Sequence, residues 1–381
     1  MPATPAADHD EHASLLCLLT SGATASSIRR LLDSHGSARG ALRAGARDWA
    51  SHGLDAATCG AVRNPDGALL ARGQAWLASP GHELIGWSQA DYPPLLRRIP
   101  SPPPMLFVAG DASLLWRPAI AIVGSRAATV GGCANAAMFA DALSRNSLCI
   151  ASGLAAGIDA AAHEAALVAD GNTVAVLGTG PDIAYPVRNR PLLERIEARG
   201  CVVSEHLPGT RPLRQYFPSR NRILAGLSLG TLVVEAAERS GALITARLAA
   251  EVGREVFALP GSIHNPMARG SHRLIREGAQ LVESPDEVLG VLAPLACDLA
   301  KALRGELDAI RTRPGAPRQA SLPIDPHYNS LWLALGHDPT GMDELGQRTG
   351  LTAAELSAML LTLELEGRVS AEHGRYCRIG P

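Results

Sequence analysis

The sequence CVVSEHLPGTRPLRQYFPSRNRILAGLSLGTLVVEA, residues 201–236, places an arginine-rich segment between two apolar runs. The runs Cys201–Glu205 and Thr231–Glu235 have the length and β-branched content of buried strands. The segment that follows Pro218 has the pattern of a helix beginning at a proline. A strand, a helix and a second strand in this order are typical of a parallel sheet that helices cover on both faces.

The same alternation extends from about residue 105 to residue 290. We expect strands at Ala119–Val123, Leu148–Ser152, Thr173–Leu177, Cys201–Glu205, Thr231–Glu235, Glu255–Leu259 and Gln280–Val282. The predicted fold class is therefore α/β. Ligands of such sheets bind beyond the carboxyl ends of the strands, so the turns that follow the strands are the candidate functional segments.

Glycine-containing turns follow four of these strands. They are Gly124-Ser125-Arg126, Ser152–Asp159 with Gly153 and Gly157, Gly178-Thr179-Gly180, and Pro260-Gly261-Ser262. Glycine lets backbone amides approach a phosphate, and helix N-termini favour anions. Between Arg211 and Arg222 there are four arginines and no carboxylate, in a chain with a formal net charge of -2. The sequence predicts a local anion site; the competing interpretation is that the arginines pair with carboxylates at the edge of the core.

The motifs narrow the choice of anion. The chain lacks a G-x-G-x-x-G after an early strand and lacks a Walker sequence, which disfavours dinucleotide binding and nucleoside triphosphate hydrolysis. Tyr185, Tyr216 and Phe217 fall in polar or arginine-bearing loops, and rings beside cations suit single-stranded nucleic acid. Each ring singly could equally cap the edge of the core.

Histidine spacing gives no sign of catalysis or of metal binding. His163 with Glu164 could suggest a catalytic pair, and His206, His264 and His272 a metal site. Their irregular spacing favours solvent-facing or capping histidines instead. We therefore predict that these histidines form neither a catalytic pair nor a metal site.

Composition is that of an ordinary globular protein. The 381 residues are 46% hydrophobic and 19% charged, and nearly all the positive charge is arginine, since the chain contains one lysine, Lys301. The seven cysteines are dispersed without a CxxC pair, which indicates reduced thiols. No apolar run reaches 18 residues and the N-terminus has no basic region, so we expect a cytoplasmic protein without a membrane segment.

Composition also suggests domain boundaries. We expect a small helical domain at 1–80, with a flexible tail over 1–10 and helices at Ser14–Leu19, Ala25–Leu32 and Ala41–Trp49. A proline-rich stiff connector follows at 81–104, the sheet domain at 105–293 and a linker at 294–324. Residues 325–381 should form three helices, at Tyr328–Leu335, Met342–Arg348 and Thr352–Glu366, and a hairpin at Arg368–Ile379. That order of elements is typical of a winged helix.

Six of these motifs resemble the DNA-processing protein DprA (Smf) family. They are Ile122–Arg126, Ser152–Asp159, Val176–Gly180, Phe217–Ser228, Ser240–Ala246 and Val256–Gly261. The block FPSRNRILAGLS at 217–228 is the most specific of them. The resemblance implies an extended Rossmann-like fold that binds single-stranded DNA, forms a homodimer and loads the recombinase RecA onto DNA taken up in natural transformation. It implies neither catalysis nor a cofactor.

The resemblance also implies which residues contact DNA. Arg126 matches the arginine of the family's G-S-R turn, and Arg220 and Arg222 match those of its R-N-R block. Together with the turns, the predicted DNA site comprises Gly124, Ser125, Arg126, Gly153, Gly157, Asp159, Gly178, Gly180, Tyr185, Phe217, Ser219, Arg220, Asn221 and Arg222. Some family members have a basic residue where this chain has Asn172, which puts one phosphate contact in doubt.

The winged helix departs from a DNA-reading pattern. Its would-be recognition helix contains Glu355, Glu364 and Glu366 and no basic residue, so the phosphate backbone would repel it. We therefore expect this domain to contact protein.

Two other functions remain open. A nucleotide-processing enzyme similar to the LOG-type phosphoribohydrolases would carry a P-G-G-x-G-T block and a downstream glutamate. Here Pro260-Gly261-Ser262 lacks the second glycine, and Gly230-Thr231 with Glu235 is a partial echo. A structural adaptor that acts through its terminal domains is the third hypothesis.

Overall fold

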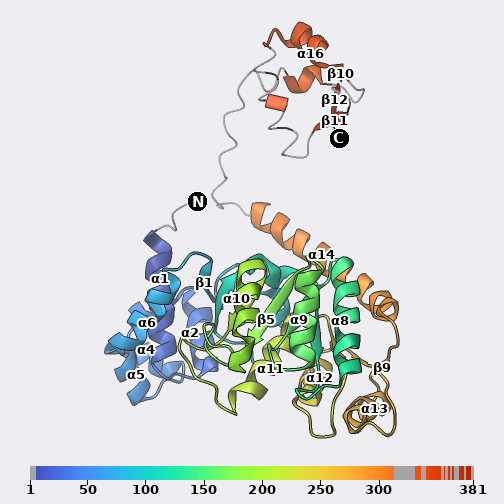
Figure 1. Cartoon of the computed structure of the whole chain (residues 1–381). Coiled ribbons are helices and arrows are strands. Elements are labelled where there is room, and N and C mark those ends of the chain that lie inside the picture. Colours follow the sequence, from blue (N-terminus) through green and yellow to red (C-terminus); the bar gives the residue numbers. More distant parts are fainter. Residues whose placement is uncertain are drawn as a thin grey trace. The chain divides into compact units, whose positions relative to one another are not determined.

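The computed structural model describes residues 6–312, 331–335, 340–352, 356, 359–360, 363, 369–372 and 375–378. The chain divides into two compact units, Met1–Ala300 and Lys301–Pro381 (Figure 1). The first unit contains the large sheet and the candidate site, and the second contains a smaller sheet. Among the described residues, no helix has both the length and the apolar character needed to cross a bilayer.

A nine-stranded sheet forms the centre of the first unit. Its strands are β1 (His82–Gly86), β2 (Met105–Gly110), β3 (Ala119–Val123), β4 (Cys149–Ser152), β5 (Thr173–Leu177), β6 (Cys201–Ser204), β7 (Gly230–Val233), β8 (Glu255–Ala258) and β9 (Gln280–Leu281). Their order in the sheet is β1-β2-β6-β5-β4-β3-β7-β8-β9. The seven predicted strands are β3 to β9, all parallel and within two residues of the predicted bounds. The order reverses between β3 and β7, which is where ligands of open α/β sheets bind.

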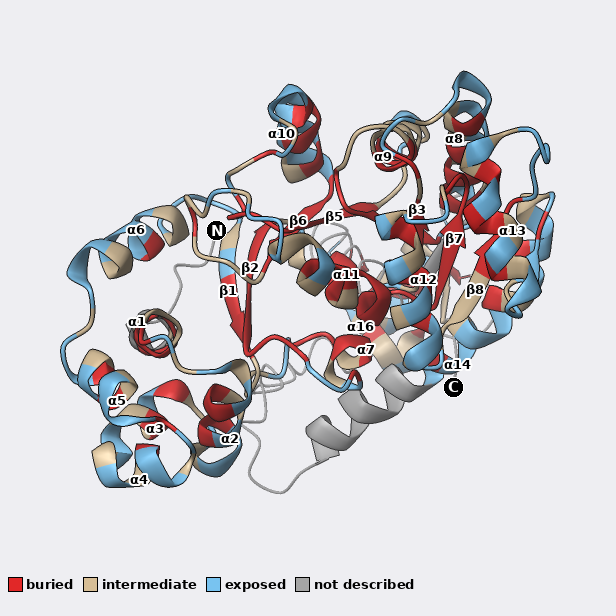
Figure 2. Ribbon diagram, turned by 90° about the horizontal axis from the view of Figure 1, so that it is seen from below, coloured by how far each residue is buried: buried red, intermediate tan, exposed pale blue. Residues whose placement is uncertain are grey.

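Helices cover both faces of this sheet (Figure 2). One face carries α8 (Val130–Arg145), α9 (Ile158–Val168) and α10 (Arg190–Arg199), and the other carries α7 (Pro94–Arg97), α11 (Tyr216–Leu227) and α12 (Gly241–Glu251). Short segments η1 (Ala112–Trp116), η2 (Val187–Asn189), η3 (Pro266–Ala268) and α13 (Arg269–Arg276) complete the connections.

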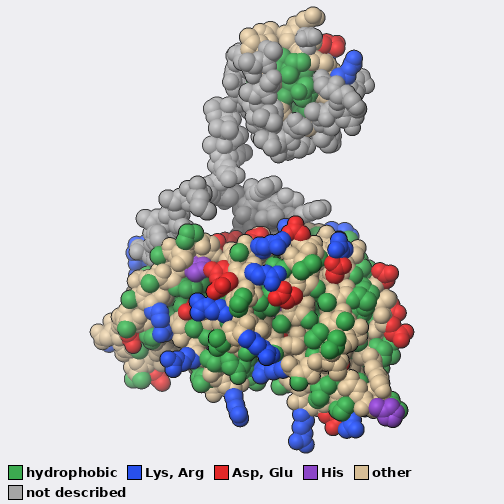
Figure 3. Space-filling view, in the orientation of Figure 1, with side chains coloured by type: hydrophobic (Ala, Val, Ile, Leu, Met, Phe, Trp, Pro, Cys, Tyr) green, Lys and Arg blue, Asp and Glu red, His purple; other side chains and the backbone are tan. Residues whose placement is uncertain are grey.

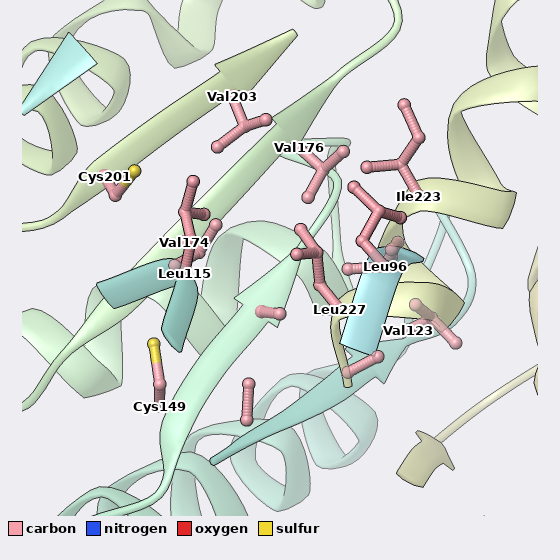
Figure 4. Close-up of a cluster of buried hydrophobic side chains, with 14 of the residues drawn as sticks. Leu96, Leu115, Val123, Cys149, Val174, Val176, Cys201, Val203, Ile223 and Leu227 are labelled. Atoms are coloured by element: carbon pink, nitrogen blue, oxygen red, sulfur yellow. The ribbon is translucent and has the colours of Figure 1, made fainter. Parts of the chain in front are cut away.

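The core beneath α11 explains how that helix is held. Ile223 and Leu227, four residues apart and therefore on one helical face, are buried with Val174 and Val176 of β5 (Figure 4). Burying each such side chain stabilises the fold by about 1.5–3 kcal/mol. The apolar stripe thus fixes the rotation of α11, and with it the direction in which Arg220 and Arg222 point.

The predicted connector at 81–104 is wrong for much of its length, because β1 and α7 lie within it. β1 pairs antiparallel with β2, which pairs antiparallel with β6, so both extend the sheet. The surrounding prolines and the mixed sequence HELIG hide β1 from a periodicity argument. The sheet therefore begins before residue 105.

The described residues up to 80, which begin at Ala6, form six helices: α1 (Ala6–Thr20), α2 (Ala25–His35), α3 (Ala38–Ala44), α4 (Ala46–Ser51), α5 (Ala56–Arg63) and α6 (Gly67–Leu77). The flexible tail predicted for 1–10 is wrong from Ala6 onward, since α1 begins there. The single helix predicted for Ala41–Trp49 is divided at Gly45, whose φ of +86° ends α3 and starts α4. We refer to α1–α6 as the helical subdomain.

The predicted linker at 294–324 is wrong over its first part. Helix α14 runs from Pro285 to Thr312 and includes Pro294. The remainder of that segment lies outside the described residues.

The second unit agrees with the predicted elements where it is described. Helix α16 (Met342–Thr349) and the antiparallel pair β11 (Val369–Glu372) and β12 (Arg375–Arg378) match the expected helix and hairpin, and β10 (Thr340–Gly341) adds a third strand. Residues 331–334 are helical, as are the described residues between 356 and 363. Leucines from these segments share a buried cluster with Val369. The acidic residues Glu355, Glu364 and Glu366 lie outside the described residues.

All seven cysteines are free, as their spacing predicts. Cys17, Cys59, Cys149 and Cys201 are buried, and burial raises the pKa of Cys149 to about 12. These thiols act as small apolar core groups.

Candidate nucleic-acid interface

The turns beyond β3, β4 and β5 surround two adjoining hollows. The first, here called the outer hollow, has a volume of about 290 Å³ and is lined by Arg126, Gly153, Ala155, Ala156, Tyr185, Pro186, Arg188, Phe217 and Arg220. The second, the switch-point crevice, has a volume of about 460 Å³ and lies between the Gly124–Ala127 turn, α11 and α12. Arg126, Phe217 and Arg220 line both. Arginine side chains project from the lower edge of the body, beneath α11 and α12, in Figure 3.

Arg126 is exposed at the junction of the two hollows, and its turn is rigid. The Ser125 amide donates to the Glu235 carbonyl at 2.7 Å, and the Ser125 hydroxyl accepts from the Ala127 amide at 3.1 Å. Gly124 is packed so closely that a Cβ would lie 2.6 Å from Ile158. The structure shows no ion pair to Arg126 among the described residues. A fixed turn therefore presents this exposed cation to both hollows.

Two aromatic rings lie beside this cation. The Arg126 guanidinium carbon is 5.3 Å from the centroid of Phe217, and the rings of Phe217 and Tyr185 are 5.2 Å apart. Tyr185 is 42% exposed, so its face is open to a stacking partner. Gly178 leaves room for Phe217, because a Cβ there would lie 3.3 Å from the ring. The fold thus brings together a guanidinium and two rings from two turns and the start of α11.

Arg220 is buried at the floor of the hollows. Its Nη1 donates to the Val176 carbonyl at 2.6 Å, and its Nε has no hydrogen-bond partner. The guanidinium occupies the space above Gly153, where a Cβ would collide with it. Burial lowers the pKa of Arg220, while Asp159 partly restores it. Arg220 supplies a fixed positive potential from below the surface.

Asp159 is buried and holds the turn after β4. Its Oδ2 accepts from the amides of Gly153 at 3.1 Å and Ala155 at 3.3 Å. Burial raises the pKa of Asp159, and Arg220 lowers it in part. We interpret Asp159 as a positioning residue that shapes the turn, since a carboxylate would repel a phosphate.

Arg222 does not reach either hollow. It forms an ion pair with Glu205 at 2.5 Å, and both side chains are largely buried. The competing interpretation, pairing with a carboxylate at the edge of the core, therefore describes Arg222. Between the two arginines, the Asn221 side-chain amide donates to the Gly241 carbonyl at 3.4 Å. The Ser219 hydroxyl donates to the Tyr216 carbonyl at 3.0 Å, within the first turn of α11.

Gly157 and Gly180 have packing roles. Gly157 has a φ of +80°, and a Cβ there would collide with the Ser125 carbonyl, so glycine lets the two turns meet. The amide of Gly180 donates to the Thr210 carbonyl at 2.9 Å, which joins its turn to the loop before α11. Asn172 precedes β5 and thus lies at the opposite end of that strand from the hollows.

The histidines differ from expectation at two positions, since the Nε2 of His206 is buried without a hydrogen-bond partner and His163 is buried as well. His163 is fully buried, with Nδ1 2.7 Å from the Thr173 hydroxyl, so the expectation of a solvent-facing or capping side chain is wrong there. Burial lowers its pKa to about 3. His264 is exposed, and His272 bonds to the backbone of Gly261. The described residues include no cluster of three metal-ligating side chains.

Glu235 is the residue that partly matches the glutamate of the phosphoribohydrolases, and its carboxylate has a structural role. Its carboxylate accepts from the Thr129 amide at 2.9 Å, the Thr129 hydroxyl at 2.7 Å and the Asn265 side-chain amide at 3.3 Å. These bonds secure the start of α8, where a carboxylate is favoured. The enzymatic alternative therefore lacks a free acid at the position that suggested it.

Arg188 was not predicted as a site residue. It is exposed, lines the outer hollow and lies three residues after Tyr185. Its position in the connection after β5 was the available signal, but the glycine turn of that connection, Gly178-Thr179-Gly180, ends eight residues before it.

Comparisons with known proteins identify the family of this chain. Residues 83–293 match the family described as DNA recombination-mediator protein A, and residues 314–375 match the DprA winged helix domain. The chain is 41% identical over 305 residues to Protein Smf of Escherichia coli, covering 80% of this chain and 79% of that protein. It is 49% identical over 198 residues to DNA processing protein DprA of Streptococcus pneumoniae, covering 52% and 70%.

Solved structures give the same result. The chain superposes on DprA from Streptococcus pneumoniae with a TM-score of 0.65 and 37% identity, covering 76% of this chain and 98% of that one. For DprA from Helicobacter pylori, whose structure concerns its single-stranded DNA binding mode, the TM-score is 0.51 at 27% identity, covering 56% and 96%. The predicted α/β fold with a C-terminal winged helix is confirmed. This chain belongs to the DNA-processing protein DprA (Smf) family.

Proposed function

We propose that this chain binds single-stranded DNA across the outer hollow and acts as a recombination mediator. The observation that carries the proposal is the exposed, unpaired Arg126 lying over Phe217, with Tyr185 and Arg188 on the same hollow. A cation beside open ring faces is the arrangement that an unpaired strand needs, because its phosphates and bases are both accessible.

Each group has a role in binding. Arg126 and Arg188 contact phosphates, while Tyr185 and Phe217 stack on bases, which is tolerant of sequence because every base has a π face. Arg220 adds positive potential from beneath the floor. The affinity should therefore fall as the salt concentration rises. Each phosphate contact should steepen the slope of log affinity against log salt concentration by about 0.7. Binding and release require neither a cofactor nor a chemical step.

We extend the proposal to two partners. The bound strand is protected and presented to the recombinase RecA during natural transformation in the cytoplasm, and a second copy of this chain forms a homodimer with the first. Membership of the DprA family supports both statements, and the related DprA from Helicobacter pylori binds single-stranded DNA.

Fluorescence anisotropy with a labelled poly-dT strand tests the site. Arg126→Ala should weaken binding by about 1–3 kcal/mol and flatten the salt slope. Arg145→Ala is the matched control, since Arg145 is an exposed arginine on α8 that pairs with Asp141 at 2.9 Å. Equal affinity of the two variants would reject the site.

Two further measurements test the role. RecA-promoted strand exchange should be stimulated by the wild-type chain and not by Arg126→Ala. Absence of any binding to poly-dT would favour the structural adaptor, and release of free base from nucleoside monophosphates would favour the enzyme.

A further inference from the structure

The helical subdomain touches the DNA-binding edge of the sheet at one loop. Residues 207–210 follow β6, and Arg72 of α6 lies against Gly209, where a Cβ would be 3.3 Å from Arg72 Cδ and 3.4 Å from Nη1. Gly209 has a φ of +77°, so glycine is suited to this position. An arginine from outside the sheet domain therefore lies on the loop beside the candidate site.

This loop is continuous with the turns of the outer hollow. The Gly209 amide donates to Asp182 at 2.7 Å, and the Gly180 amide donates to the Thr210 carbonyl at 2.9 Å. Both bonds join the loop to the turn after β5, which holds Gly178 beneath Phe217. The ends of β3, β4, β5 and β6 are successive neighbours in the sheet, so the surface runs without a gap from Arg126 to Arg72.

Arg72 is held in place by its helix. Trp76, one turn further along α6, stacks on His82 at 4.0 Å and meets Phe107 edge-on at 5.7 Å. Gly73 packs against Leu16, which a Cβ would approach to 2.7 Å. These contacts fix α6 on the sheet, so Arg72 stays beside the loop although its side chain is exposed.

Charge along this stretch favours a polyanion. Arg211 and Arg214, in the loop before α11, are exposed, and no ion pair is seen for them or for Arg72 among the described residues. Asp182 uses one carboxylate oxygen to accept from Gly209, and Glu205 is paired with Arg222. Cations therefore exceed free carboxylates between the outer hollow and α6.

We propose that Arg72 of the helical subdomain forms a second contact for single-stranded DNA, on phosphates of the strand after it leaves the outer hollow past Arg211 and Arg214. This inference rests on the proposed function and extends it to strands longer than the hollow. Three strand spacings of about 4.8 Å separate β3 from β6, roughly 14 Å. At about 3.4 Å or more per nucleotide, an oligonucleotide of about three nucleotides held at Arg126 would not reach α6.

Strand length provides the test. Anisotropy is measured for the full chain with poly-dT of about 3 and about 25 nucleotides, lengths that bracket common site sizes of about 4–16. Arg72→Ala should weaken binding of the long strand roughly 3- to 10-fold, with a salt slope smaller by about 0.7, and leave the short strand unchanged. Arg72→Glu should enlarge the loss. Arg63→Ala, an exposed arginine on α5 of the same subdomain, is the matched control.

The outcomes separate this inference from the proposed function. If Arg126→Ala weakens both lengths while Arg72→Ala matches Arg63→Ala, the Arg72 contact is wrong and the outer hollow stands. If Arg72→Ala weakens both lengths equally, its effect is structural and the inference is rejected, with thermal unfolding showing the lost stability. If the wild-type chain binds neither length, both proposals fail.

Discussion

Arginines have different surroundings on two surfaces of the first unit. One surface is the edge of the sheet that carries the hollows, and the other is the outer face formed by α8, α9 and α10. On the outer face, Arg145 pairs with Asp141 and Arg195 pairs with Glu164. At the sheet edge, Arg126 and Arg188 are exposed with no ion pair among the described residues. Exposed ion pairs contribute little to stability, so the outer arginines chiefly balance charge and aid solubility. Neighbouring cations without carboxylates repel one another, and a bound polyanion relieves that repulsion.

A sharper contrast lies within α11. Arg220 and Arg222 are two residues apart and point to different sides of the helix. Arg220 lies over Gly153 at the floor of the hollows, whereas Arg222 is paired with Glu205. Two arginines in one motif thus have different roles, and their neighbours determine which.

The largest effect is expected at Gly153. In Gly153→Ala the new Cβ collides with the Arg220 guanidinium, which must leave its site or strain the turn. The free energy of unfolding should fall by about 2–3 kcal/mol, and poly-dT affinity should fall with it. Gly241→Ala is the control, because a Cβ at Gly241 meets nothing within 4 Å. Equal urea-unfolding midpoints for Gly153→Ala and Gly241→Ala would show that the Arg220 guanidinium does not lie over Gly153.

Glu205→Gln tests the other arginine. It leaves the largely buried Arg222 charge without its partner, so the free energy of unfolding should fall by about 2 kcal/mol. Poly-dT affinity of the folded variant should stay at the wild-type value. Glu194→Gln breaks the exposed pair with Arg190 and should cost about 0.5 kcal/mol or less. A loss of affinity as large as that of Arg126→Ala would show that Arg222 belongs to the interface after all.

Tyr185→Ala separates stacking from charge. Loss of one ring should weaken poly-dT binding by about 1–2 kcal/mol while the salt slope stays constant, since no ionic contact is removed. Tyr185→Phe should retain most of the affinity. Titrations at two salt concentrations measure both quantities, and a flattened slope in Tyr185→Ala would contradict the stacking role.

The smallest effect concerns His206, whose ring centroid lies 4.1 Å from that of Tyr216 in a tilted arrangement. Burial, and then Arg222, lower its pKa to about 4. Between pH 6.5 and 4 the unfolded chain binds a proton there that the folded chain does not, so this group costs stability as the pH falls. His206→Phe keeps the ring and removes the titration. The free energy of unfolding is measured by urea denaturation at pH 7 and at pH 5.5. Its decrease between these two values should be about 1 kcal/mol smaller in His206→Phe than in the wild type.

Burial raises the pKa of Glu205 and Asp159, which acts in the opposite direction on stability. Both groups remain in His206→Phe, so the difference between the two chains isolates the histidine. Parallel pH curves for wild type and variant would show that His206 is not shielded from protonation.

Much of the fold follows from local pattern. Most of the parallel strands β3 to β9 are short apolar runs, and glycine turns follow four of them, so such runs are readable one at a time. Strand β1 was missed because its five residues include a histidine, a glutamate and a glycine, and because prolines surround it. Its strand character comes from pairing with β2, a tertiary effect on weak local propensity.

The site was only partly predictable for a similar reason. Arg126 was identifiable from its place after a strand, and the resemblance to DprA assigned it to DNA. The fates of Arg220 and Arg222 depend on Gly153 and Glu205, which are distant in the chain, so spacing could not distinguish them. Arg188 lacked a motif, and only the fold places it beside Tyr185.

Strand β2 lies between two hydrophobic clusters and contributes side chains to both. Met105 and Phe107 face the helical subdomain, while Leu106 and Val108 face the core under α7 and α11. A chain that lacks residues 1–80 would keep the core under α7 and α11 intact. The cluster on the side of the helical subdomain would be open to water, with Leu84, Met105 and Phe107 exposed. We expect such a fragment to associate with other copies of itself through these exposed apolar side chains.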